Sequence, residues 1–351
     1  MPSSERRIFS NHKLSRRNLL IATGMVAGAA ASSSLGVGPR EVGSFLEISY
    51  EYGPEVARAV LSHPGQSLEA FKLWKGPDRA YEKSSVFAEN LVYRKGSANN
   101  IIGFGDSNLV GPDGTNWQES PIVLYKDLAV QEKGVENWQD FNCAKGGSTT
   151  DMIIQQQVPS QRAMDGFGMG VGCDVWINAG GNDVANLVHN VHDVEELRRL
   201  TQNPFADMDL LFKYTGRIED NLQNFETNFL NLLHAIYNPL YVPNIRQFVI
   251  MSMPDFGRAR SIITQEFNGG AYIIDLKSSA VRRLIGNISI LMNNAIFKSV
   301  ETFQKETGSR IIGINAARGG MSDFSSNQHY SEAACQEIAQ TALSRMDVTA
   351  A

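Results

Sequence analysis

A serine with the surroundings of a nucleophile follows a short apolar run at residues 101–105. The run reads Ile-Ile-Gly-Phe-Gly and is followed by Asp106, Ser107 and Asn108, which are residue types that end a strand. A buried strand ending here leaves Ser107 at its carboxyl end, where open α/β sheets bind their ligands. The serine hydroxyl becomes a nucleophile when a base takes its proton and nearby donors stabilise the oxyanion that forms.

A histidine near the carboxyl terminus, His329, is the best candidate for that base. It precedes a predicted helix from Glu332 to about Met346, for which Ser331 is a suitable N-cap. The other histidines lie in the amino-terminal segment, in the stretch after it, in a long connection or in a helical pattern: His12, His63, His189, His192 and His234. Elimination therefore favours His329.

Alternating short apolar runs and helical patterns predict the elements that position these residues. The runs predicted as strands are 101–105, 139–143, 174–179, 247–252 and 310–314. Between them, apolar residues at spacings of three and four predict one helix that contains Ile218 to Leu232 and another that contains Leu284 to Ala295. This alternation is typical of repeated βα units and a parallel sheet. It predicts one α/β domain over residues 100–351, preceded by an extension over residues 32–99 that packs on it.

The first 31 residues have the pattern of an export signal. Arg16 and Arg17 precede a charge-free stretch at residues 18–38, and Ala29-Ala30-Ala31 offers a small-residue cleavage site. The stretch Ser15 to Leu20 resembles the twin-arginine motif, which predicts a partner in the twin-arginine export machinery and a periplasmic or secreted protein. A transmembrane anchor is the alternative for this segment.

Composition argues against several other classes of function. The chain has 351 residues, a net charge of -5 and 20% charged residues, with no dense Lys/Arg block after the amino terminus, so nucleic acid is not an expected partner. Its three cysteines, Cys143, Cys173 and Cys335, permit at most one disulfide and lack metal-ligand spacing. We expect neither a metal nor a cofactor.

Four motifs in order resemble the conserved blocks of the GDSL or SGNH hydrolase family. Gly105-Asp106-Ser107-Asn108 is similar to the first block, with Asn108 where many members have Leu. The segments 141–149 and 177–183 resemble the second and third blocks, and Met253-Pro254-Asp255-Phe256-Gly257 resembles the Pro-x-x-Gly segment of lipase-like members. The resemblance covers roughly residues 100 to 345.

This resemblance implies a three-layer, flavodoxin-like SGNH hydrolase fold with a mostly parallel five-stranded sheet. It implies a serine esterase in which Ser107 attacks the ester and His329 is the base. The N–H groups of Ser107 and Gly147 and the side-chain amide of Asn182 would form the oxyanion hole. The lipase-like motifs imply a lipid or other small carboxylic ester as substrate, and peripheral membrane contact through it. Alternatives are an O-acetyl esterase or acetyltransferase acting on a polysaccharide, and a non-catalytic binding protein on the same scaffold.

The family's fifth block, Asp-x-x-His, is not matched in full. Ser326 stands three residues before His329, and the nearest upstream carboxylate is Asp323. The acid of a serine triad orients the imidazole and stabilises its charged form. We predict Asp323 in this role. The alternatives are Ser326, a backbone carbonyl or a carboxylate from elsewhere. Residues 183–216 could form a cap over the cleft or a surface helix pair.

Overall fold

The computed structural model describes residues 87–94, 98–135, 137–168, 171–184, 199, 208–259, 261–265, 271–275, 279–317, 323–324 and 329–349. The predicted export signal, most of the predicted extension and cap, and Ser326 lie outside these residues. In the part of the chain that is described, no helix combines the length and the apolar character needed to cross a membrane.

Five parallel strands form the central sheet and confirm the predicted fold class. They are β2 (Asn99–Gly105), β3 (Trp138–Asn142), β4 (Gly172–Asn178), β5 (Ile245–Met251) and β8 (Ile311–Ile314). Their order is β3-β2-β4-β5-β8 and every neighbouring pair is parallel. This is the flavodoxin-like order 2-1-3-4-5, whose ligands bind at the carboxyl ends of the strands. All five runs predicted as strands are confirmed, within two residues at each end.

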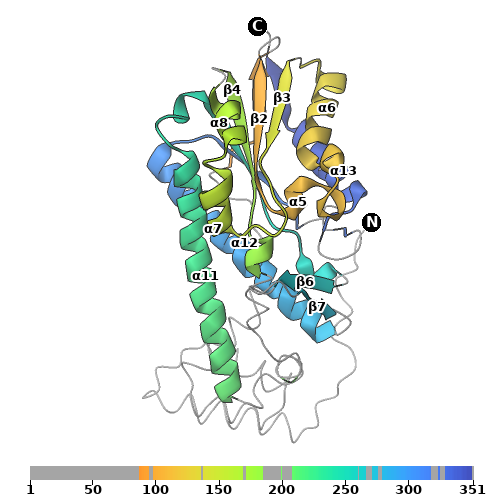
Figure 1. Ribbon diagram of the computed structural model, residues 1–351, viewed down its shortest axis with the longest axis vertical. Helices are drawn as coiled ribbons and strands as arrows, with labels where there is room; N and C mark the ends of the chain where they lie inside the picture. Colours follow the sequence, from red (N-terminus) through yellow and green to blue (C-terminus); the bar gives the residue numbers. More distant parts are fainter. Residues whose placement is uncertain are drawn as a thin grey trace, which may run out of the picture.

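Helices cover both faces of this sheet and complete three layers (Figure 1). One face packs against α8 (Gln161–Gly168), α11 (Met208–Ile236) and α12 (Ser279–Thr307), and the other against α6 (Pro121–Lys133) and α13 (Glu332–Ser344). Alternation along β4 shows why, because Val175 and Ile177 lie in the first core and Trp176 in the second. The helices predicted around Ile218 and Leu284 are confirmed as α11 and α12.

Two smaller sheets flank the main one. In the first, β1 (Leu91–Arg94) pairs in parallel with β9 (Met346–Thr349), and in the second β6 (Ser261–Gln265) pairs antiparallel with β7 (Ala271–Asp275). The remaining elements are short helices: α5 (Ser107–Val110), η2 (Pro112–Gly114), η3 (Trp117–Glu119), α7 (Thr150–Met152), η4 (Ile153–Gln157), η5 (Val242–Asn244) and η6 (Phe256–Arg258). The pairing of β1 with β9 joins the end of the predicted extension to the carboxyl-terminal strand.

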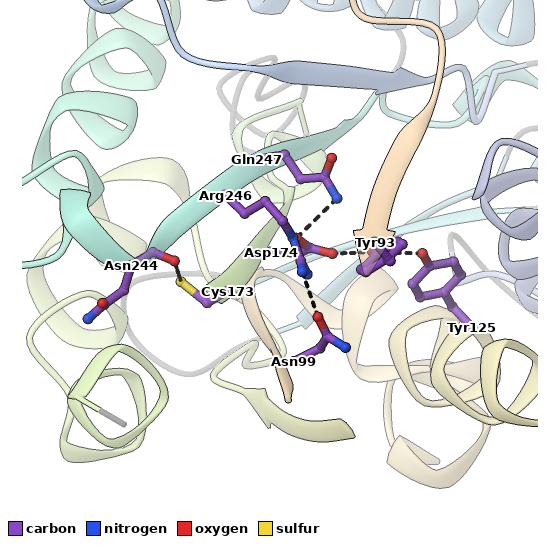
Figure 2. A network of polar contacts seen from close by, with 8 residues as sticks. All are labelled: Tyr93, Asn99, Tyr125, Cys173, Asp174, Asn244, Arg246 and Gln247. Atoms are coloured by element: carbon purple, nitrogen blue, oxygen red, sulfur yellow. Dashed lines mark hydrogen bonds and ion pairs between the residues drawn. The ribbon is translucent and has the colours of Figure 1, made fainter. Parts of the chain in front are cut away.

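A buried polar network ties β1 to the amino ends of the central strands (Figure 2). Asp174 on β4 accepts hydrogen bonds from Tyr93, from Arg246 Nε at 2.9 Å and from Gln247 Nε2 at 3.1 Å. The hydroxyls of Tyr93 and Tyr125 lie 2.8 Å apart. Asp174 is fully buried, so its charge depends on these partners. The network lies at the opposite end of the strands from Ser107.

Candidate active site

Ser107 lies where β2 gives way to the short helix α5. Asp106 is the N-cap of α5, and its carboxylate accepts a hydrogen bond from Asn108 N at 2.9 Å. The cap ends the strand and turns the chain at Ser107, whose side chain lies at the carboxyl edge of the sheet. Ser107 is 7% exposed, so its hydroxyl is largely shielded from bulk water.

His329 and Ser107 converge on the same glycine. A Cβ placed on Gly114 would lie 2.9 Å from Ser107 Cβ and 3.0 Å from His329 Nε2. His329 Nε2 and the side chain of Ser107 therefore both lie next to the position that a Cβ of residue 114 would take. That position holds no atom of residue 114 because the residue is glycine. Gly114 also has φ of 71°, a conformation that other residues adopt at a cost. The structure thus brings together two predicted residues that are 222 positions apart in the sequence.

The electrostatic surroundings of His329 favour a neutral imidazole. Burial lowers the pKa of His329 below its ordinary value, and the negative charge of Asp113 raises the pKa partway back. A neutral imidazole has a free nitrogen lone pair and accepts a proton, as a general base must. Asp113 precedes Gly114 in the turn that contacts His329.

Asp323, the predicted acid, has a hydrogen-bonded position at the start of α13. Its carboxylate accepts from Ser331 Oγ at 2.9 Å, and its backbone oxygen accepts from Ser331 N at 3.0 Å. Ser331 in turn caps α13 through Ala334 N at 3.1 Å, which confirms the predicted N-cap. These contacts give Asp323 a role in anchoring the segment that carries His329. Its action as the acid partner stays a prediction.

The second predicted block forms a tight turn beside the nucleophile. Ser148 N donates to Lys145 O at 3.3 Å, and Gly147 has φ of 79°, which explains glycine at this position. A Cβ placed on Gly146 would lie 3.8 Å from Ser107 Cβ. The turn that contains Gly147 therefore lies against Ser107.

The third block fixes the side chain of Asn182 against the same turn. Asn182 Nδ2 donates to Ser148 O at 3.0 Å. A carboxamide has two N–H groups in one plane. This bond uses one of them and thereby fixes the direction in which the second N–H points. Asn182 is therefore oriented by the loop that carries Gly147.

Two buried carboxylates support these loops. Asp106 accepts from Gly181 N at 3.1 Å through its second oxygen, and Asp183 accepts from Thr150 N at 3.0 Å and from Thr150 Oγ1 at 3.1 Å. Burial raises the pKa of Asp106 to about 7 and that of Asp183 to about 6, against an ordinary value of 3.8. Hydrogen-bond donors lower the pKa of each carboxyl, chiefly Asn108 and Gly181 for Asp106 and Thr150 for Asp183, but burial outweighs them.

Sequence reasoning missed two residues that contact this region. Asp113 lies in a Pro-Asp-Gly turn, which is a common turn sequence, and its φ of 57° is unusual for a residue other than glycine. Gln157 hydrogen bonds to Gly105 and Ser148 from the π-helical turn η4. Gln157 is the last of three consecutive glutamines, and such a run carries no sequence signal for this role.

The fold and site together define a class: a flavodoxin-like α/β protein with a serine, a histidine and amide donors gathered at the carboxyl edge of its sheet. Such a set has the groups needed for acyl transfer through a covalent serine intermediate. Among the described residues, no group of three His, Cys, Asp or Glu side chains could hold a metal ion.

Comparisons with known proteins give only distant similarities. No protein-family model matches the chain, and no curated protein matches it. Among solved structures, an extracellular lipase from Streptomyces rimosus is 15% identical, with a TM-score of 0.42, over 70% of this chain and 100% of its own. A phospholipase A1 from Streptomyces albidoflavus is 16% identical, with a TM-score of 0.41, over 71% and 98%. An acetylxylan esterase from Geobacillus stearothermophilus is 12% identical, with a TM-score of 0.40, over 72% and 94%. Likenesses this distant establish no function.

Proposed function

We propose that this protein is an exported SGNH-type serine esterase that cleaves carboxylic esters. The observation that carries the proposal is the convergence of Ser107 Cβ and His329 Nε2 on one point beside Gly114. The turn of Gly147 and the amide of Asn182 lie against the same edge of the sheet. Export rests on the amino-terminal sequence pattern.

The reaction proceeds through an acyl-enzyme. His329, neutral because burial lowers its pKa, takes the proton of Ser107 as the serine oxygen attacks the ester carbonyl. The N–H groups of Ser107 and Gly147 and the amide of Asn182 stabilise the tetrahedral oxyanion, at about 3 kcal/mol per donor. The imidazolium then gives its proton to the departing alcohol. Water repeats the sequence on the acyl-enzyme, with His329 again taking and returning the proton.

The test of the proposal is hydrolysis of p-nitrophenyl esters by the protein and by Ser107→Ala. We expect the variant to lose more than about a thousandfold in turnover, because the nucleophile is absent. A fluorophosphonate probe should label the unaltered protein at Ser107 and leave the variant unlabelled. Turnover by Ser107→Ala at the unaltered rate would refute the assignment of the nucleophile. A folded protein that neither hydrolyses esters nor reacts with the probe would indicate a binding protein.

The length of the acyl chain separates the two enzymatic alternatives. Lipid ester hydrolysis, which the lipase-like motifs favour, predicts turnover that rises from acetate towards longer chains. A sharp preference for acetate would favour an O-acetyl esterase or acetyltransferase acting on polysaccharide. Adding an alcohol acceptor during acetate turnover then distinguishes transfer from hydrolysis, because transfer yields a new acetate ester.

A further inference from the structure

Gln157 makes three hydrogen bonds that converge on the nucleophile strand and the oxyanion turn. Its Oε1 accepts from Gly105 N at 3.0 Å, and its Nε2 donates to Gly105 O at 2.8 Å and to Ser148 Oγ at 3.1 Å. Gln157 is 4% exposed, so water does not compete freely for these bonds. The oxygen and the nitrogen of this side-chain amide therefore both bond to segments that surround Ser107.

The position of these bonds explains why the residue is a glutamine. β2 pairs with β3 as far as Gly103. Beyond it, Lys145 N donates to Gly105 O at 3.2 Å, whereas Gly105 N donates to the side chain of Gln157. The carboxamide of Gln157 has the donor and the acceptor of a peptide group, and it binds both the N–H and the C=O of Gly105. Gln157 therefore completes the hydrogen bonding of Gly105, two positions before Ser107, by accepting from its N–H and by adding a second donor to its C=O.

The same amide links the three segments that carry the predicted oxyanion donors. Gly105 leads to Ser107, Ser148 follows Gly147, and Ser148 O accepts from Asn182 Nδ2 at 3.0 Å. Gln157 bonds the first segment to the second, and Ser148 bonds the second to the third. A shift of Gln157 would therefore change the distance between the nucleophile and its oxyanion donors.

We propose that Gln157 is a positioning residue, which sets the placement of the Gly147 turn relative to Ser107. This inference rests on the proposed esterase function. Gln157 acts through Gly105 and Ser148 and does not touch the substrate. It comes from the π-helical turn η4, a geometry that often occurs at functional sites.

The test replaces Gln157 with methionine, which has a similar volume and shape but no amide. We expect kcat for p-nitrophenyl ester hydrolysis to fall between about tenfold and a hundredfold with KM unchanged, because misplaced donors weaken the transition state more than ground-state binding. Ser148→Ala, which removes only the hydroxyl, should give a smaller fall in kcat. If the methionine variant does not fold, Gln157→Glu replaces it in the test. The glutamate keeps the acceptor for Gly105 N but faces Gly105 O without a donor, so this variant should also lower kcat.

The matched control is Gln247→Met. Gln247 is 1% exposed and also bonds through its amide, to Asp174 at the amino ends of the strands, away from Ser107. Both methionine variants should lower the melting temperature, but only Gln157→Met should lower kcat. Unchanged kcat in the folded Gln157 variants, or an equal fall in Gln247→Met, would overturn the positioning role. Absence of ester turnover in the unaltered protein would instead refute the proposed function, and loss of turnover in Ser107→Ala separates the two failures.

Discussion

Replacing Asp106 with asparagine should remove a large pH dependence from the stability of this protein. The pKa of Asp106 is about 7 in the folded protein, against an ordinary value of 3.8. Between these values the unfolded chain has released the proton that the folded protein still holds. The free energy of unfolding therefore falls as the pH rises from about 4 to about 7. A shift of about 3 pKa units corresponds to about 4 kcal/mol.

The asparagine variant should lack this loss because its amide stays neutral at every pH. Its carbonyl oxygen still accepts from Asn108 N, while its NH₂ group faces Gly181 N and cannot accept from it. The hydroxyl oxygen of a protonated Asp106 is a weaker acceptor than a carboxylate oxygen, so the free energies of unfolding of the two proteins should be closest at acid pH. Near neutral pH the variant should be the more stable of the two, by up to about 4 kcal/mol.

Urea unfolding followed by tryptophan fluorescence measures both proteins, at pH values from about 4 to about 8. Asp183→Asn is the companion variant. Because the pKa of Asp183 is raised to about 6, its contribution should be smaller, about 3 kcal/mol, and complete at lower pH. If the free energies of Asp106→Asn and the unaltered protein differ by a constant amount across the range, the raised pKa of Asp106 is wrong.

Four further changes probe the site and the core. Gly114→Ala should lower kcat by about tenfold or more, because a Cβ there would lie 3.0 Å from His329 Nε2, and ester turnover of the purified variant measures this. Asp113→Asn should move the acid limb of kcat/KM to lower pH by a few tenths of a unit, since it removes the charge that raises the His329 pKa; an unmoved limb would contradict this. Asp323→Asn should cut kcat strongly if that carboxylate is the acid partner, whereas a loss of thermal stability alone would limit it to anchoring α13. Arg246→Met should lower the free energy of unfolding by about 3 kcal/mol in urea titrations without changing kcat, because it leaves a buried carboxylate without its cation.

Most of the central sheet could be predicted from the sequence because β2, β4, β5 and β8 are buried along most of their length, whereas β3 at the edge is only partly buried. Such strands appear as short apolar runs that end in Gly, Ser or Asn, and all five runs proved to be strands. The helices α11 and α12 were predictable for a similar reason, since their apolar faces repeat every three or four residues. The pairs β1–β9 and β6–β7, which lie outside the central sheet, were not predicted.

The sequence named Ser107, Gly147, Asn182 and His329, because motif order and residue chemistry are both visible in it. Their convergence required the tertiary structure, because positions 107 and 329 meet at one edge only when the strands have paired in parallel into a sheet. The structure also revealed that Asp113 acts on His329 and that Gln157 bonds to Gly105 and Ser148. Their roles depend on contacts between segments far apart in sequence or on a backbone turn, and no local pattern encodes either.

The export signal and the type of reaction are therefore expectations drawn from sequence alone, read from composition and motif order. The tertiary structure decided which side chains surround the nucleophile. It set the neutral state that burial favours for His329 and the raised pKa values of Asp106 and Asp183. The physical reason is that burial and hydrogen-bond partners arise only when distant segments pack, whereas residue type and order exist before folding.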